Sequence, residues 1–257
     1  MAAHITSSSN PRIKRLAGLR DRKARDLESV FLVEGMAGIE RAMDAGHHPL
    51  EVYYDPARHA SAPFPTEIEL SVEQAALDRA SYRGRSQGVI AVFGQFDVGL
   101  NALRLGSDPL LIVVEAIEKP GNLGAILRTA DAVGAAAVIA ADPGTDPFNP
   151  NVIRASTGTL FSVPIAVSDL ETAVVWLRES SIRLVAADPD GETPLWSADL
   201  TGACALLVGA EHDGLTQAAK AAAGTTVSIP MRGSADSLNA SVAAAVLAYE
   251  ALRQRLA

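Results

Sequence analysis

Thr226-Val-Ser-Ile-Pro-Met-Arg-Gly-Ser-Ala-Asp-Ser-Leu-Asn-Ala-Ser-Val242 is the stretch that decides the fold of this 257-residue chain. It begins as a short apolar strand, continues as a glycine-containing loop and leads into a long helix, which we expect over 237–256. Apolar residues recur there at every third or fourth position, which predicts one buried helical face. The members of that face are Leu238, Val242, Val246, Tyr249, Leu252 and Leu256.

Polar side chains gather where this helix is expected to begin. Backbone N–H groups are unpaired at a helix N-terminus, so Asp236 or Ser237 could simply cap it. Asn239 is harder to explain in that way, because asparagine is a poor helix former and the apolar face needs no amide there. The junction is therefore either a capped helix start or a binding site.

Two further stretches have the same order of strand, loop and helix. Residues 203–215 are an apolar run that ends in a loop bounded by Gly209 and Gly214. Taken alone, this loop is a solvated turn. Residues 110–134 contain a buried strand, a loop and a helix. Three such junctions imply a parallel sheet whose loops converge at the carboxyl ends of the strands, where open α/β sheets bind ligands.

Arg128 lies within the helix expected over 121–134. At about 100° per residue, its apolar neighbours share one face and Arg128 points away from it. That apolar face consists of Leu123, Ile126, Leu127 and Ala130. An exposed, solvated arginine and a functional one fit this geometry equally well.

Three motifs follow one another in these stretches. They read Asn122-x-Gly124-x-Ile126-x-Arg128-Thr129-Ala130, Gly209-x-Glu211-x-x-Gly214-Leu215 and Ile229-Pro230-Met231-x-Gly233-x-x-x-Ser237-Leu238-Asn239-x-Ser241-Val242-Ala243. In order and spacing they resemble the motifs of the SpoU (TrmH-like) ribose methyltransferases of the SPOUT superfamily. The resemblance covers residues 108–257 well and the N-terminal part more loosely. Ala240, where the family commonly has valine, is a small departure.

The resemblance implies a deep trefoil-knotted α/β domain that binds S-adenosylmethionine in the knot and works as a homodimer. By the same resemblance, the cofactor is held by the backbone around Leu207, Gly209, Ala210, Ile229, Met231, Leu238 and Asn239. The catalytic or substrate-orienting set would be Arg128, Glu211, Ser237 and Asn239. Asn122 and Arg128 would also contact RNA. A family-like segment, 149–158, adds Arg154, which either contacts a substrate phosphate or supports local structure.

The chemistry of ribose methylation makes demands of its own. A 2′-hydroxyl is a poor nucleophile, so it must be placed in line with the methyl carbon and relieved of its proton. The family's arginine is often treated as the base, yet a guanidinium has a pKa above about 12. We therefore interpret Arg128 as a phosphate clamp that stabilises the developing oxyanion. Ser237 and Asn239 would hydrogen-bond the ribose or the cofactor.

Charge is distributed unevenly along the chain. The net charge of −8 is not typical of a nucleic-acid-binding protein, but residues 1–25 carry seven basic residues and one acidic residue. We expect a helix over 10–25 that packs by an apolar edge and presents cations to RNA. A solvated charged helix is the alternative. The apolar edge contains Ile13, Leu16 and Leu19, and the RNA-binding cations are Arg20, Arg22, Lys23 and Arg25.

The N-terminal part is predicted to be a smaller α/β domain. Its expected elements are a strand at 30–33, a helix at 35–45, a strand at 50–54, a helix at 71–80 and a strand at 88–93. It resembles the ribosomal-protein-like substrate-binding domain that precedes many SpoU catalytic domains. The expected boundaries are an RNA-binding domain at 1–95, a linker at 96–109 and the methyltransferase domain at 110–257. Tyr82-Arg-Gly-Arg85 could contact RNA, although the family commonly has proline where Ser86 stands.

Other functional classes fit poorly. The single cysteine, Cys204, argues against disulfides, zinc ribbons and a thiol mechanism, and fits a reducing cytoplasm. We expect neither a metal nor a membrane partner, and motifs of dehydrogenases, ATPases and hydrolases are missing from the sequence. The sequence thus predicts an S-adenosylmethionine-dependent ribose 2′-O-methyltransferase that acts on structured RNA, with ribosomal RNA first and transfer RNA second. The alternative is a non-catalytic RNA-binding or assembly protein that retains the knot.

Overall fold

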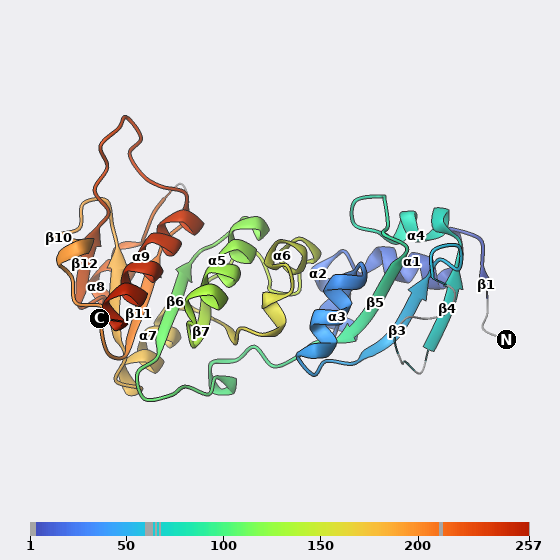
Figure 1. Cartoon of the computed structure of the whole chain (residues 1–257), viewed down its shortest axis with the longest axis horizontal. Coiled ribbons are helices and arrows are strands. Elements are labelled where there is room, and N and C mark those ends of the chain that lie inside the picture. The colour runs from blue at the N-terminus through green and yellow to red at the C-terminus, as the bar shows by residue number, and fades with distance from the viewer. Residues whose placement is uncertain (1–3, 60–63, 65, 67, 211–212, 257) are drawn as a thin grey trace. The chain divides into compact units, whose positions relative to one another are not determined.

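The computed structural model describes residues 4–59, 64, 66, 68–210 and 213–256, and the chain divides into two compact units. The first unit comprises residues 1–96 together with 146–161, and the second comprises 97–145 together with 162–257. The sequence-based division differs in two respects: it places 146–161 with the rest of 110–257, and it treats 96–109 as a linker, whereas 97–109 belongs to the second unit. Figure 1 follows the chain through both units.

The second unit is built on a seven-stranded sheet in which every pairing is parallel. Its strand order is β10-β12-β9-β11-β6-β7-β8. The strands are β6 (Leu110–Glu115), β7 (Ala137–Ala141), β8 (Ile165–Ser168), β9 (Arg183–Ala187), β10 (Thr193–Pro194), β11 (Cys204–Val208) and β12 (Thr225–Ser228). Every residue of β6, β7 and β11 is buried, as central strands of a parallel sheet require. The predicted parallel α/β sheet is confirmed.

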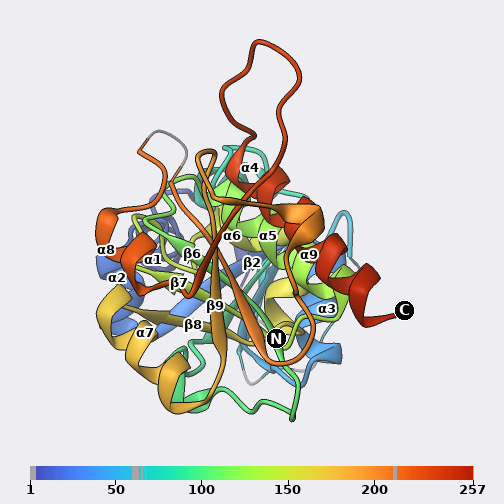
Figure 2. The same cartoon turned by 90° about the vertical axis from the view of Figure 1, so that its left-hand side faces the viewer.

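Helices cover both faces of this sheet (Figure 2). On one face α5 (Pro120–Val133) and α9 (Ala240–Arg255) pack against each other and against β6, β7 and β11. On the other face lie α7 (Leu170–Glu179) and α8 (Gln217–Ala222). Two short 3₁₀ turns, η1 (Leu100–Ala102) and η3 (Leu195–Ser197), complete the unit. None of the helices in the described part of the chain is long and apolar enough to cross a bilayer.

The last helix differs from its prediction in two ways. It begins at Ala240, three residues later than expected, and the expected apolar face is not the buried one. Tyr249 is 52% exposed and Leu256 is 78% exposed. The buried face consists mainly of small residues that allow close packing on α5, namely Ala240, Ala244, Leu247, Ala248 and Ala251.

The first unit contains a five-stranded mixed sheet in the order β1-β4-β3-β5-β2. Its strands are β1 (His4–Ile5), β2 (Val30–Glu34), β3 (Pro49–Tyr54), β4 (Ile68–Val72) and β5 (Val89–Gly94). Its helices are α1 (Pro11–Gly18), α2 (Arg22–Glu28), α3 (Met36–Asp44), α4 (Gln74–Ala80) and α6 (Pro150–Ser156), and η2 (Thr159–Phe161) is a 3₁₀ turn. The expected strands at 30–33, 50–54 and 88–93 are confirmed. Strand β4 was missed, because the prediction assigned 71–80 to one helix.

Two packed clusters hold the first unit together. Ile13, Leu16 and Leu19 are fully buried with α4 against the sheet, so the predicted apolar edge is confirmed. The single helix expected over 10–25 is instead two helices, with Asp21 capping the second. The other cluster is aromatic: the ring of Phe31 stacks on the rings of Phe93, Phe148 and Phe161. Through Phe148 and Phe161 this cluster fixes 146–161 in the unit.

Candidate functional site

The three predicted motifs lie at one edge of the second unit's sheet. Strands β6 and β11 are neighbours, with Val114 opposite Val208 near their carboxyl ends. Strand β12 runs parallel to them beyond β9. Because all these strands are parallel, the connections that follow β6, β11 and β12 leave the sheet at the same edge. The sequence predicted this convergence.

Helix α5 presents its polar residues as expected. Leu123, Ile126, Leu127 and Ala130 are fully buried, and Arg128 is exposed. Asn122 is half-buried in the first turn, and its Nδ2 atom is buried without a hydrogen-bond partner among the described residues. An amide donor in this state is expected to pair with a bound polar group, since a buried unpaired donor costs about 1–3 kcal/mol.

The loop after β11 closes tightly on itself. The backbone N–H groups of Ala210 and Gly214 each donate to the other residue's carbonyl oxygen, at 3.2 Å in both cases. A Cβ atom at position 209 would overlap the backbone of Gly214, so only glycine fits there. Leu207 is fully buried and can offer a ligand only its backbone. Glu211, one of the predicted catalytic residues, lies outside the described residues.

Glu115, the last residue of β6, was missed by sequence reasoning. The residue is 2% exposed, and its carboxylate accepts two hydrogen bonds from Thr216, one from the backbone N at 3.0 Å and one from Oγ1 at 2.6 Å. Thr216 Oγ1 in turn accepts from the backbone N of Ala219 and so caps α8. Glu115 therefore ties the exit of the 209–215 loop to β6. An acidic residue that ends an otherwise apolar strand is the signal that could have identified it.

The connection between β12 and α9 is a long loop that extends from the unit (Figure 2). Ile229 and Leu238 are half-buried, whereas Met231 and Ser237 are exposed. Asn239 is the N-cap of α9: its Oδ1 accepts from the backbone N of Ser241 at 3.0 Å and from Ser241 Oγ at 2.6 Å. Capping thus explains why asparagine stands there.

Asn239 also joins two of the predicted motifs. Its Nδ2 donates to Asn122 Oδ1 at 3.4 Å, although the two residues lie 117 positions apart. This contact brings the start of α9 to the start of α5. In the described part of the chain, neither Arg128 nor Ser237 has a side-chain hydrogen-bond partner, so both remain available to a ligand.

The basic residues of the first unit do not all face solvent. Arg25 is 1% exposed; its guanidinium donates to the carbonyl oxygens of Leu19 and Arg20 and forms an ion pair with Asp146 at 2.8 Å. Because Arg25 is buried and paired with Asp146, its surroundings give no support to the predicted contact of Arg25 with RNA. Arg20 donates to backbone carbonyl oxygens at the end of α4.

The remaining predicted cations are accessible. Arg22 and Lys23 are exposed on α2, and Arg22 lies 3.4 Å from Asp26 in an ion pair across one helical turn. Arg154 is exposed on α6 and donates to Asn151 Oδ1 at 2.9 Å. These three side chains stay candidates for contact with phosphate.

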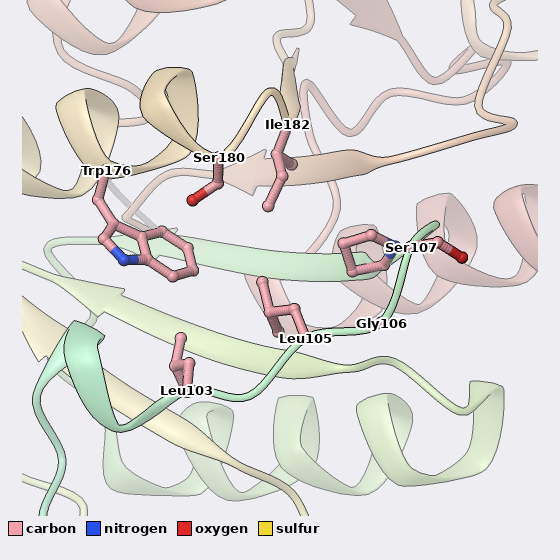
Figure 3. Close-up of a pocket in the computed structure, with 8 residues that line it drawn as sticks. Leu103, Leu105, Gly106, Ser107, Trp176, Ser180 and Ile182 are labelled. Carbon is pink, nitrogen blue, oxygen red and sulfur yellow. The ribbon is translucent and has the colours of Figure 1, made fainter.

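A crevice of about 220 Å³ lies elsewhere on the second unit (Figure 3). It is lined by Leu103, Leu105, Trp176 and Ile182, among others, and it lies near the start of β6 and β9, since Pro109 and Ile182 directly precede these strands. None of the predicted site residues lines it. The crevice is therefore separate from the edge where the three motifs meet.

Comparison with known proteins agrees with this geometry. Residues 109–249 match the SpoU rRNA Methylase family, and residues 10–91 match the MRM3-like substrate binding domain. The chain is 35% identical to the 23S rRNA (uridine(2479)-2′-O)-methyltransferase of Streptomyces viridochromogenes, over 99% of this chain and 94% of that protein.

Solved structures resemble both units. One is described as an RNA 2′-O ribose methyltransferase, with a TM-score of 0.86, 43% identity and coverage of 99% of this chain and 100% of that one. Another is the AdoMet-bound rRNA methyltransferase from Sinorhizobium meliloti, with a TM-score of 0.90, 30% identity and coverage of 100% and 99%. The motifs, the sheet that carries them and these matches lead to one conclusion: the chain belongs to the SpoU rRNA methylase family.

Proposed function

We propose that this chain is an S-adenosylmethionine-dependent ribose 2′-O-methyltransferase that acts on ribosomal RNA. The observation that carries the proposal is the match of nearly the whole chain to a 23S rRNA 2′-O-methyltransferase, with the three motifs at one sheet edge. A transfer RNA substrate has less support. The Streptomyces and Sinorhizobium enzymes named above are ribosomal RNA methyltransferases, and each matches this chain over both of its units. The same substrate implies a cytoplasmic location.

The residues at the sheet edge fit S-adenosylmethionine. Gly209 allows the backbone of Gly214 to pack directly against it, so the chain after β11 turns tightly at this sheet edge. The buried Nδ2 of Asn122 is an unused donor beside Asn239. The residues that would hold the cofactor are the backbone of Leu207, Gly209, Ala210, Ile229, Met231, Leu238 and Asn239. When bound, the cofactor supplies a methyl group on a positively charged sulfur.

The chain's own residues would then orient the ribose. Arg128, exposed on α5, clamps a substrate phosphate and stabilises the negative charge that develops on the 2′-oxygen. It does not act as the base, because a guanidinium retains its proton at neutral pH. Ser237 and Asn239 hydrogen-bond the ribose or the cofactor, and Glu211 completes the proposed catalytic set. Positioning supplies much of the rate in this scheme.

The second unit would be knotted and would pair with a second copy. The knot is proposed from the resemblance to the SpoU methyltransferases, and the membership of the chain in that family supports it. An exposed apolar stripe on α9 supports the homodimer. Val242, Tyr249 and Leu256 expose large apolar surfaces along it, which is typical of an interaction face.

Mapping of 2′-O-methylated riboses tests the proposed function. Ribosomal RNA from cells with and without the gene is compared, and the gene is restored either intact or as Arg128→Ala. We expect one ribosomal position to lose its methyl group without the gene and to regain it only with the intact form. If ribosomal RNA is unchanged and a methyl group is lost from transfer RNA, the substrate is transfer RNA and not ribosomal RNA. No change in either RNA would refute the activity.

A further inference from the structure

The chain between α4 and β5 forms an exposed loop with unusual composition. In Figure 1 this connection stands beside the sheet of the first unit as an open loop. Its tip consists of Tyr82, Arg83, Gly84 and Arg85, all exposed, and Tyr82 shows 40% of its surface. In the described part of the chain, the side chains of Tyr82, Arg83 and Arg85 have no hydrogen-bond or ion-pair partner. This tip offers an aromatic ring and two unpaired guanidinium groups.

The first end of the loop is held by two half-buried side chains, Glu34 and Arg20. Glu34, at the end of β2, accepts from Ser81 Oγ at 2.8 Å and from the backbone N of Tyr82 at 2.7 Å. Arg20 donates to the carbonyl oxygens of Arg79, Ala80 and Ser81. Arg20 thereby satisfies the free carbonyls at the end of α4 and fixes where the loop begins.

The second end is held through Ser86. Its backbone N donates to Asp78 Oδ1 at 2.7 Å, and its carbonyl oxygen accepts from Gln74 Nε2 at 3.0 Å. Proline has no N–H, so a proline at this position could not make the contact with Asp78. The departure from the family pattern at Ser86 therefore has a structural role in this chain. Both ends of the loop are fixed, and a tip fixed in this way loses little entropy when it binds.

The turn at the tip separates the two arginines. Gly84 has a φ of +69°, and its backbone N donates to the carbonyl oxygen of Ser81 at 3.1 Å. Two carboxylates contact the loop: Glu34 accepts from Ser81 Oγ and the backbone N of Tyr82, and Asp78 accepts from the backbone N of Ser86 and from Gln74 Nε2. They do not form ion pairs with Arg83 or Arg85. The positive charge at the tip is thus available to an anionic partner.

An aromatic ring flanked by free arginines suits single-stranded nucleic acid. Base stacking on an exposed ring tolerates any sequence, and guanidinium groups pair with phosphates. We propose that Tyr82–Arg85 binds an unpaired nucleotide of the RNA substrate, with Tyr82 stacked on the base and Arg83 and Arg85 on flanking phosphates. This inference rests on the proposed function, because it takes RNA as the substrate. It assigns substrate recognition in the first unit to this loop in place of the buried Arg25.

The test compares loop variants with a matched control in the full-length protein. The probes are 23S rRNA transcribed in vitro, a hairpin with an unpaired loop and a fully paired duplex. Arg83→Gln/Arg85→Gln should lower the slope of log affinity against log salt by about 1.4 to 1.8, since two phosphate contacts are lost. Arg12→Gln/Lys14→Gln removes two exposed charges from α1 and should change the slope less.

Tyr82 separates stacking from charge. Tyr82→Leu should weaken binding to the hairpin by about 5-fold to 150-fold with the salt slope unchanged, whereas Tyr82→Phe should bind like the wild type. Binding to the duplex should change little. Thermal unfolding and calorimetry with S-adenosylhomocysteine confirm that each variant is folded and binds cofactor.

The outcomes distinguish this inference from the proposed function. If the wild type neither binds nor methylates ribosomal RNA, the proposed function fails. If the wild type methylates RNA and the loop variants retain its affinity and salt slope, only the loop assignment is overturned. Equal losses of RNA affinity and salt slope in the loop and α1 double variants would also overturn the loop assignment. They would indicate that RNA is attracted to any positive charge on the surface. Loop variants that lose binding to an acidic protein but not to RNA would reassign the partner.

Discussion

Replacing Thr216 by valine tests the buried anchor at the sheet edge. The change preserves the shape of the side chain and removes the 2.6 Å hydrogen bond from Oγ1 to Glu115. A hydrogen bond to a charged group contributes about 1.5–3 kcal/mol, and Glu115 is too buried for water to replace it. The same substitution removes the cap of α8, which costs about 1 kcal/mol. We expect the free energy of unfolding to fall by about 2.5–4 kcal/mol.

The functional effect follows from the position of Thr216 directly after the 209–215 loop. When its exit is released, the loop spends less time in the geometry that binds cofactor, and the apparent affinity falls in proportion. A loss of about 1.4 kcal/mol of loop ordering corresponds to a tenfold higher Kd for S-adenosylhomocysteine. Urea unfolding followed by circular dichroism gives the stability, and calorimetry gives the Kd.

Thr172→Val is the matched control. Thr172 also donates both its backbone N and its Oγ1 to one carboxylate, that of Asp169, but this pair is exposed on α7. Its loss should cost less than about 1 kcal/mol and leave cofactor binding unchanged. Equal stability losses in the two variants would refute the argument from burial. A large stability loss at Thr216 with an unchanged Kd would show that the anchor serves the fold alone.

Three other perturbations test separate parts of the structure. Arg128→Ala should reduce single-turnover methyl transfer by about 100-fold with cofactor binding intact, and Arg128→Lys should restore it only partly; near-wild-type activity of the lysine variant at neutral pH would instead identify Arg128 as the base. Tyr249→Glu should place a charge on the exposed stripe of α9 and give a monomer by light scattering, so a dimer that persists would move the interface elsewhere. Ser86→Pro should release the second end of the Tyr82–Arg85 loop from Asp78 and weaken binding to the RNA hairpin, although it removes no side chain proposed to contact RNA. An affinity equal to that of the wild type would show that this anchor is not needed.

Local patterns in the sequence were sufficient for two strands and one helix that carry the motifs in the second unit, namely β6, β11 and α5. Apolar runs marked the buried strands at 110–115 and 204–208, and helical spacing placed Arg128 opposite a buried face. These features depend on residues close by in the sequence, and a periodic pattern of apolar residues reports on that range. The motifs then located the site, since parallel strands bring their following loops to one edge.

For α9, the sequence could not decide which face the rest of the chain covers. On α9 the larger apolar residues, such as Tyr249, face outward, and alanines pack on α5. Periodicity identifies a face that favours burial but not the partner that buries it. Strand β4 was missed for a related reason: Ile68–Val72 is followed almost at once by α4, so a short alternating pattern merged with a helical one.

Only the tertiary structure revealed how the charged residues are used. Arg25 looked like its basic neighbours along the chain, yet its partner, Asp146, lies 121 positions away. Arg20 caps α4, about 60 positions further on, and Glu115 holds Thr216 across 101 positions. The sequence determined segments such as β6, β11 and α5, because the preferences that form them are local. The structure decided which charges are buried, because a charge is stable in the interior only where distant residues supply its partners.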